Sequence, residues 1–195
     1  MYLVLPFDLS LFSAINGLHA PWADFCFYWI SNRFVWIPLY IIVIYWIIND
    51  YRKKSIAILL GIVFAIFATD QSCNLLKNGV GRLRPSHEPT LENTIHLVTR
   101  SDGKLYKGGK FGFPSAHAAN ATAFFTIVML FIYKKRSWIL LPFLFWVLLL
   151  CYSRIYLGVH YPTDIFVGIL LGGGVATLFL WPIRYWIMHS CSKLS

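Results

Sequence analysis

Residues 138–181 read WILLPFLFWVLLLCY, then SRIYLGVHYPTD, then IFVGILLGGGVATLFLW. The first and last parts are apolar and uncharged, whereas the middle part, residues 153–164, holds an arginine, a histidine and an aspartate. An apolar stretch of about 20 residues is typical of a helix that crosses a membrane. The pattern therefore indicates two membrane helices joined by a short polar segment.

Three further apolar segments precede this pair. The five predicted helices lie in residues 34–48, 55–69, 116–133, 138–152 and 165–183. Several are shorter than the roughly 20 residues of a usual span, and we expect polar helical extensions at one face to make up the difference. Residues 20–32 are a candidate for a sixth helix. Residues 7–22, FDLSLFSAINGLHAPW, are expected to form an amphipathic helix in the membrane interface, with a plain loop as the alternative.

The composition supports an integral membrane protein. The 195 residues are 58% hydrophobic and 13% charged, whereas a soluble domain is about a quarter charged. We predict an all-α integral membrane fold with a single domain, residues 1–195. The four cysteines form no CxxC pair, so buried free thiols are favoured over a disulfide framework or a zinc site.

The formal charge of +9 would suggest a nucleic-acid partner in a soluble protein. No basic helix with interleaved aromatic residues is present, so we expect no nucleic acid. We interpret the charge as anchoring at the membrane surface and attraction of an anionic substrate.

The links between the predicted helices differ in length. Residues 49–54 and 134–137 are short and basic, and the tail adds Arg184 and Lys193. If the helices alternate in direction, these links share one side, and the long segment 78–113 lies on the other. Basic residues in short loops favour the cytoplasm. We therefore predict a cytoplasmic membrane protein whose segment 78–113 is extracytoplasmic and carries part of an active site.

Polar residues flank the predicted helices at that same face. They are Lys77, Arg82 and Arg84 after the second helix, Ser115 and His117 at the start of the third, and Arg154, His160 and Asp164 between the fourth and fifth. Ionisable residues at the ends of membrane spans usually mark function. We expect the three patches to surround one pocket, although Arg82 could equally be a simple interfacial cation.

The residue types indicate phosphate chemistry. Lys77, Arg84 and Arg154 could clamp a phosphoryl group. Ser115 is a predicted N-cap, and the N–H groups of a helix start suit an oxyanion. A neutral imidazole is a nucleophile toward phosphorus, and a protonated one can donate to a leaving group. Asp164 follows His160 by four residues and could orient its ring for attack, which leaves His117 as the general acid.

These stretches resemble the signature of the type 2 phosphatidic acid phosphatase family of membrane lipid phosphatases. That signature is K-x6-R-P, P-S-G-H and S-R-x5-H-x3-D. The corresponding stretches here are KNGVGRLRP (77–85), PSAH (114–117) and SRIYLGVHYPTD (153–164). Alanine replaces the usual glycine at position 116, which keeps the backbone N–H unless a positive φ is required.

The resemblance implies a role for each matching residue. It implies phosphate binding by Lys77, Arg84, Ser115 and Arg154, nucleophilic attack by His160, orientation of that ring by Asp164, and acid catalysis by His117. It also implies hydrolysis of a lipid phosphate or diphosphate through a phosphohistidine, without a metal or other cofactor. Our first choice of substrate is undecaprenyl diphosphate. Lipid A phosphate, phosphatidylglycerol phosphate and phosphatidate remain open as substrates, because the choice of head group is expected to depend on residues 86–113 and on the lipid groove.

Other interpretations stay open from sequence alone. A transporter or channel could place basic residues at a vestibule, and a vanadate-dependent haloperoxidase shares the resembling family's site. Glu88, Glu92 and His96 could gather as metal ligands, but a solvated loop is favoured. Asp70 is favoured as a structural polar residue. The small residues of GILLGGGV, 168–175, indicate close helix packing.

Overall fold

The structure is a computed structural model that describes residues 4–189. Within that range the regular structure is helical, apart from two isolated β-bridges in the loop after α4. The α-helices are α1 (Pro6–Asn16), α2 (Pro21–Ile30), α3 (Ile37–Tyr51), α4 (Ser55–Val80), α5 (Ala116–Phe131), α6 (Leu140–Tyr156) and α7 (Pro162–His189). The all-helical fold predicted from the sequence is confirmed.

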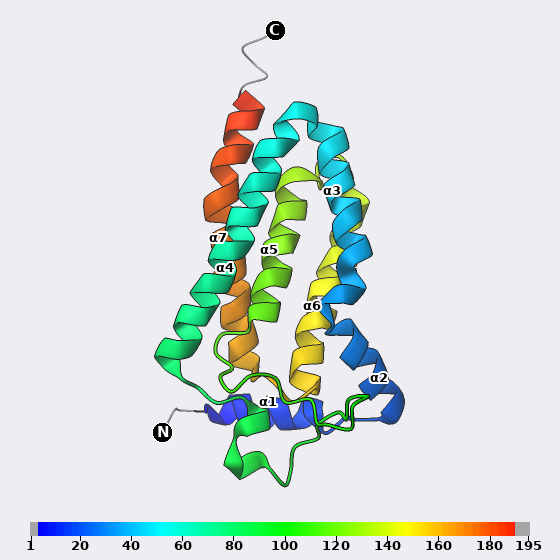
Figure 1. Cartoon of the computed structure of the whole chain (residues 1–195), viewed down its shortest axis with the longest axis vertical. Coiled ribbons are helices and arrows are strands. Elements are labelled where there is room, and N and C mark those ends of the chain that lie inside the picture. Colours follow the sequence, from blue (N-terminus) through cyan, green and yellow to red (C-terminus); the bar gives the residue numbers. More distant parts are fainter. Residues whose placement is uncertain (1–3, 190–195) are drawn as a thin grey trace.

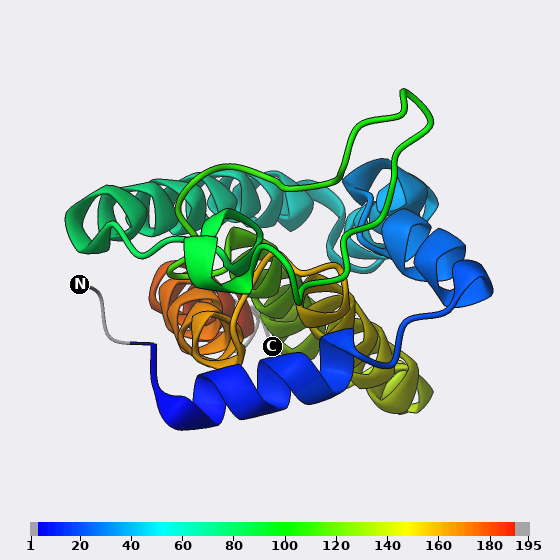
Figure 2. The same cartoon turned by 90° about the horizontal axis from the view of Figure 1, so that it is seen from below.

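Helices α3 to α7 run side by side and alternate in direction (Figure 1). The ends of α4 and α6 and the starts of α5 and α7 therefore meet at one end of the bundle. Helix α1 lies across that end, nearly at right angles to the bundle (Figures 1 and 2). The loop between α4 and α5 covers the same end (Figure 2).

Helices α4, α6 and α7 are longer than the apolar segments predicted for them, whereas α3 has the predicted length and α5 is shorter. Helix α4 has 26 residues and ends at Val80, because Gly81 adopts the left-handed conformation with φ 64°. Helix α7 starts at Pro162, a residue suited to the first helical position. Residues 20–32 contain the separate ten-residue helix α2, which is too short to cross a bilayer of about 30 Å.

Within residues 4–189, three helical stretches are long and apolar enough to cross a membrane: Arg33–Val80, Ser137–Tyr156 and Pro162–His189. The first contains α3 and α4, which fold back on each other, and α5 is a shorter apolar helix. The outer surface of the bundle carries many exposed large apolar side chains, including Leu75, which is 74% exposed, and Leu178, which is 72% exposed. Such an apolar exterior is suited to lipid, so the protein is a membrane protein with multiple apolar helices.

Small residues bring α5 and α7 together, as the sequence predicted. A Cβ atom on Gly172 would collide with the carbonyl group of Ala119, and one on Gly168 would lie 2.5 Å from the carbonyl oxygen of Ser115. The glycines thus permit close backbone contact. This contact fixes the start of α5 beside α7.

Basic residues gather at the other end of the bundle. The carboxylate of Asp50, at the end of α3, accepts hydrogen bonds from Arg136 and lies 3.6 Å from Lys135. Lys54 donates to the carbonyl of Ile187 in α7. The two short basic links therefore lie together, as predicted, while Lys193 is outside the described residues.

The cysteines in the described residues are free. Cys73 and Cys151 are buried and Cys26 is exposed. Two of these three cysteines are therefore buried free thiols, as predicted from the sequence. Cys191 lies outside the described residues.

Candidate active site

The segments that carry the three polar patches lie at the end of the bundle that α1 crosses (Figure 1). Arg84 comes from the loop after α4, and Arg154 comes from the last turn of α6. His160 precedes α7. These three side chains are buried, with His160 only 1% exposed. The juxtaposition predicted from helix alternation is therefore present.

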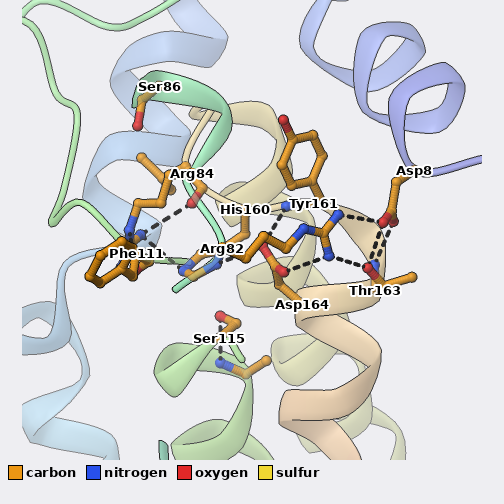
Figure 3. Close-up of polar contacts among 12 residues, drawn as sticks. Asp8, Arg82, Arg84, Ser86, Phe111, Ser115, His160, Tyr161, Thr163 and Asp164 are labelled. Carbon is orange, nitrogen blue, oxygen red and sulfur yellow. Dashed lines mark hydrogen bonds and ion pairs between the residues drawn. The ribbon is translucent and has the colours of Figure 1, made fainter. Parts of the chain in front are cut away.

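His160 lies between a cation and a carboxylate (Figure 3). Nη1 of Arg84 is 3.0 Å from His160 Nε2, and Nδ1 of His160 is 3.4 Å from Asp164 Oδ2. Because a guanidinium can only donate, Nε2 is the acceptor and the ring proton is assigned to Nδ1. The lone pair that could attack phosphorus is therefore on Nε2.

The surroundings of His160 oppose a positive charge on its ring. Burial lowers the pKa of His160 well below its usual value, and the charges of Arg84, Arg154, His117 and Lys77 lower it further. The imidazole is therefore neutral near pH 7 and able to act as a nucleophile.

Arg84 is held by the backbone around it. Its Nε donates to the carbonyl of Phe111 at 3.1 Å, and Nη1 also contacts the carbonyl of Val159 at 3.2 Å. Gly108 has φ 67°, and a Cβ atom there would lie 3.1 Å from Arg84 Nη1, so a glycine suits this turn on two counts. Burial, followed by the charge of Arg154, lowers the pKa of Arg84 to about 10, and the guanidinium stays charged at neutral pH.

Arg154 is positioned by residues outside the sequence motifs. Its Nη1 donates to the hydroxyl oxygens of Ser31 and Tyr106, the latter at 2.9 Å. Tyr106 belongs to the loop between α4 and α5, and Ser31 follows α2. Sequence reasoning missed both residues, because neither has a fixed spacing from Arg154.

Ser115 and His117 occupy the start of α5, as predicted. The Ser115 hydroxyl caps the helix by accepting from the N–H of Ala118 at 3.4 Å, and its own N–H donates to the carbonyl of Asp164 at 2.9 Å. Ser115 is fully buried, whereas His117 is partly accessible. Lys77, in the last turn of α4, is also partly accessible.

The sequence left the role of Arg82 open. In the structure its guanidinium contacts one oxygen of the Asp164 carboxylate, and His160 faces the other oxygen. Its Nη1 lies 3.1 Å from Asp164 Oδ1, and its Nη2 lies 2.6 Å from Oδ2 of Asp8 (Figure 3). Asp8 was missed, although Asp8, Phe12 and Asn16 recur every four residues and are the buried residues of α1. That spacing places two polar residues on the inward face of the helix.

The remaining sequence candidates are engaged elsewhere. His96 pairs with Asp24 at 3.0 Å, and residues 4–189 contain no group of three side chains suited to a metal ion. Asp70 accepts a hydrogen bond from Asn120 at 2.8 Å, in line with the structural role favoured for it. A cavity of about 630 Å³ lies in the covering loop, lined by residues that include Ser86, His87 and Lys107.

Comparison with known proteins identifies the family. The PAP2 superfamily model matches residues 55–188. The chain is 34% identical to a lipid A 4'-phosphatase of Bacteroides thetaiotaomicron, over 93% of this chain and 77% of the relative. It is 32% identical to a lipid A 4'-phosphatase of Porphyromonas gingivalis, over 98% and 80%.

More distant matches agree with this assignment. An undecaprenyl-diphosphatase of Sulfolobus acidocaldarius is 28% identical over 88% of this chain and 76% of its own length. The crystal structure of Aquifex aeolicus LpxE superposes with a TM-score of 0.68 at 25% identity, covering 90% of this chain and 96% of that one. The family assignment replaces the transporter and haloperoxidase alternatives. The chain belongs to the PAP2 superfamily and is a membrane lipid phosphatase of that family.

Proposed function

We propose that this phosphatase removes a phosphate group from the sugar head group of lipid A, with His160 as the nucleophile. The observation that carries the proposal is the arrangement of His160 between Arg84 and Asp164, which leaves a neutral ring with its lone pair on Nε2. That arrangement lies at the end of an apolar bundle, where a lipid could present its head group.

The proposed reaction has two displacements. His160 Nε2 attacks phosphorus, the bond from phosphorus to the lipid oxygen breaks, and His117 gives that oxygen a proton. A water molecule then loses a proton to His117 as its oxygen attacks the phosphohistidine. This second step frees the His160 ring and releases inorganic phosphate.

Cations bind the phosphoryl oxygens in both steps. Lys77, Arg84 and Arg154 are assigned this role, with Ser115 at the start of α5. In the free protein Arg84 Nη1 contacts the attacking atom of His160 at 3.0 Å. An arriving phosphate oxygen takes over this hydrogen bond and frees Nε2, so substrate binding itself uncovers the nucleophile.

The choice of substrate rests on the relatives. Two lipid A 4'-phosphatases align with nearly the whole chain at 34% and 32% identity, whereas the undecaprenyl-diphosphatase is 28% identical. This supports the lipid A alternative better than undecaprenyl diphosphate, our first choice from the sequence. The cavity in residues 85–107 begins at Pro85, directly after Arg84, and is suited in position to a sugar next to the phosphate.

We further propose that α3 to α7 are the membrane helices and that α1 lies in the interface. The active-site end then faces the extracytoplasmic side of a cytoplasmic membrane. Helix α2 is too short to span and would lie near the surface with α1. The lipid tails would remain in the bilayer while the head group enters the site.

The test is phosphate release by the purified protein from a panel of substrates. The panel holds lipid A with both phosphates, undecaprenyl diphosphate, phosphatidylglycerol phosphate, phosphatidate and a water-soluble phosphomonoester. We expect the highest kcat/KM with lipid A, loss of the 4'-phosphate by mass spectrometry, and no turnover by His160→Ala. Faster hydrolysis of another lipid would overturn the substrate, and full activity of folded His160→Ala would overturn the mechanism.

A further inference from the structure

A buried ionic network joins α1 to the start of α7 (Figure 3). The carboxylate of Asp8 accepts hydrogen bonds from Arg82 Nη2 at 2.6 Å, and from the backbone N–H and the hydroxyl of Thr163 at 2.9 and 2.6 Å. Arg82 Nη1 continues to Asp164 Oδ1 at 3.1 Å. Asp8 and Asp164 are both 0% exposed, so α1 is linked to the carboxylate beside His160 through groups shielded from water.

Helix α1 has other anchors besides this network. Phe12 packs edge-on against Tyr161 with ring centroids 5.6 Å apart. Asn16 donates to the carbonyls of His96 and Tyr156 at 2.9 and 2.8 Å. Burying an ion network is expensive in desolvation and is not, by itself, a sign of stability. A role connected with Asp164 accounts better for its presence.

The two oxygens of Asp164 are both fixed. Oδ1 accepts from Arg82, and Oδ2 accepts from the N–H of Tyr161 at 2.9 Å while facing His160 Nδ1 at 3.4 Å. These bonds set the rotation of the carboxylate. They therefore also set the tautomer and direction of the His160 ring.

Charge balance explains why Arg82 has a second carboxylate. Arg82 alone would neutralise Asp164 and weaken its attraction for a positive ring on His160. Asp8 takes the other side of the guanidinium, so that two carboxylates and one guanidinium carry one net negative charge. Phosphorylation of His160 creates a cationic ring that matches this charge.

We propose that Asp8 and Arg82 are positioning residues, which hold Asp164 against His160 and leave it the negative charge that stabilises the phosphohistidine. The proposal rests on the proposed nucleophilic role of His160. It assigns α1 a part in catalysis in addition to its place at the end of the bundle. It predicts an effect on turnover rather than on substrate binding.

The test compares isosteric and conservative variants by kcat, KM and thermal unfolding midpoint in detergent. Asp8→Asn keeps the shape of the side chain and removes its charge, and we expect kcat to fall about tenfold with KM changed by less than about twofold. Asp8→Glu should recover part of the loss. Arg82→Lys keeps a charge but cannot fork between two carboxylates, and we expect a loss of similar size.

Asn16→Ala is the matched control, because Asn16 anchors the same helix without touching Asp8 or Arg82. It should lower the unfolding midpoint while kcat stays within about threefold. Wild-type kcat in both Asp8→Asn and Arg82→Lys would overturn the proposal, as would equal losses of kcat in Asn16→Ala and Asp8→Asn at equal loss of stability. If Asp8→Asn does not fold, Arg82→Lys decides.

His160→Ala and Asp164→Asn separate this inference from the proposed function. Turnover by folded His160→Ala would refute the mechanism as a whole. If His160→Ala is inactive and Asp164→Asn is strongly impaired, but the Asp8 and Arg82 variants keep full kcat, only the positioning role fails.

Discussion

In the proposed mechanism, Arg84 links substrate binding to the state of the nucleophile. Its Nη1 contacts Nε2 of His160 at 3.0 Å, and its charge is one of the influences that lower the pKa of that ring. Burial and this guanidinium together keep the imidazole neutral, and the guanidinium holds it by a hydrogen bond until an anion arrives. A water-exposed histidine with an ordinary pKa would be partly protonated, and so partly unreactive, at pH 6 to 7.

This arrangement predicts the pH dependence of the free enzyme. Burial first, then Arg84 and Arg154, hold the pKa of His160 well below its usual value of 6.5. A depressed pKa means that the ring stays neutral as pH falls below 6.5 and becomes protonated only at lower pH. We expect the acid limb of kcat/KM to lie below pH 6.5.

Comparison of the Arg84→Gln variant with the wild type tests the electrostatic cause of that prediction. Removal of the cation raises the pKa of His160, so the acid limb of the residual activity should move to higher pH. The substrate phosphate ionises near pH 6, but it does so identically for both proteins. Acid limbs that superimpose would contradict the electrostatic role of Arg84.

At the scale of the elements, the helices and motifs were predictable and the connections were not. Ser115 caps α5 and Pro162 begins α7 because these residue types favour those positions locally. Tyr106 reaches Arg154 only through the path of the long loop, which no local pattern determines. Asp8 was missed because the rule that polar residues face outward fails in α1, where the buried face includes Asp8 and Asn16 beside Phe12.

The contact between α5 and α7 yields a prediction about stability. A methyl group at Gly172 would collide with the backbone of α5, whereas one at Gly174 would meet nothing within 4 Å. We expect Gly172→Ala to destabilise the protein by about 1 to 3 kcal/mol through overpacking, and Gly174→Ala to be neutral or slightly stabilising. Thermal unfolding in detergent compares the same chemical change at two sites two residues apart.

Activity should follow stability in this pair. Helix α5 carries His117 in its first turn, and α7 begins just after His160, so the helix contact sets the distance between the two histidines. Gly172→Ala should therefore lower kcat as well, measured below its unfolding temperature. Equal midpoints and equal kcat for both variants would show that the backbones separate at little cost.

For the whole molecule, the two ends of the bundle differ in how their basic residues are used. At the end of the bundle where α3 and α5 finish, the short links 52–54 and 134–136 each consist of Lys and Arg alone. At the other end Arg82 and Arg84 are buried in the site rather than free at the membrane surface. Because orientation follows basic residues in short loops, the short links should be cytoplasmic and the site extracytoplasmic.

Single exposed cysteines test this orientation in a variant that lacks the four natural cysteines. Lys104→Cys reports the long loop and Lys134→Cys the opposite end, and both side chains are exposed. In intact bacterial cells a membrane-impermeant maleimide should label position 104 alone, and position 134 only after permeabilisation. Each variant must first keep phosphatase activity, so that misfolded protein is not scored. Labelling of position 134 alone in intact cells would place the site in the cytoplasm, where it would act on newly made rather than exported lipid.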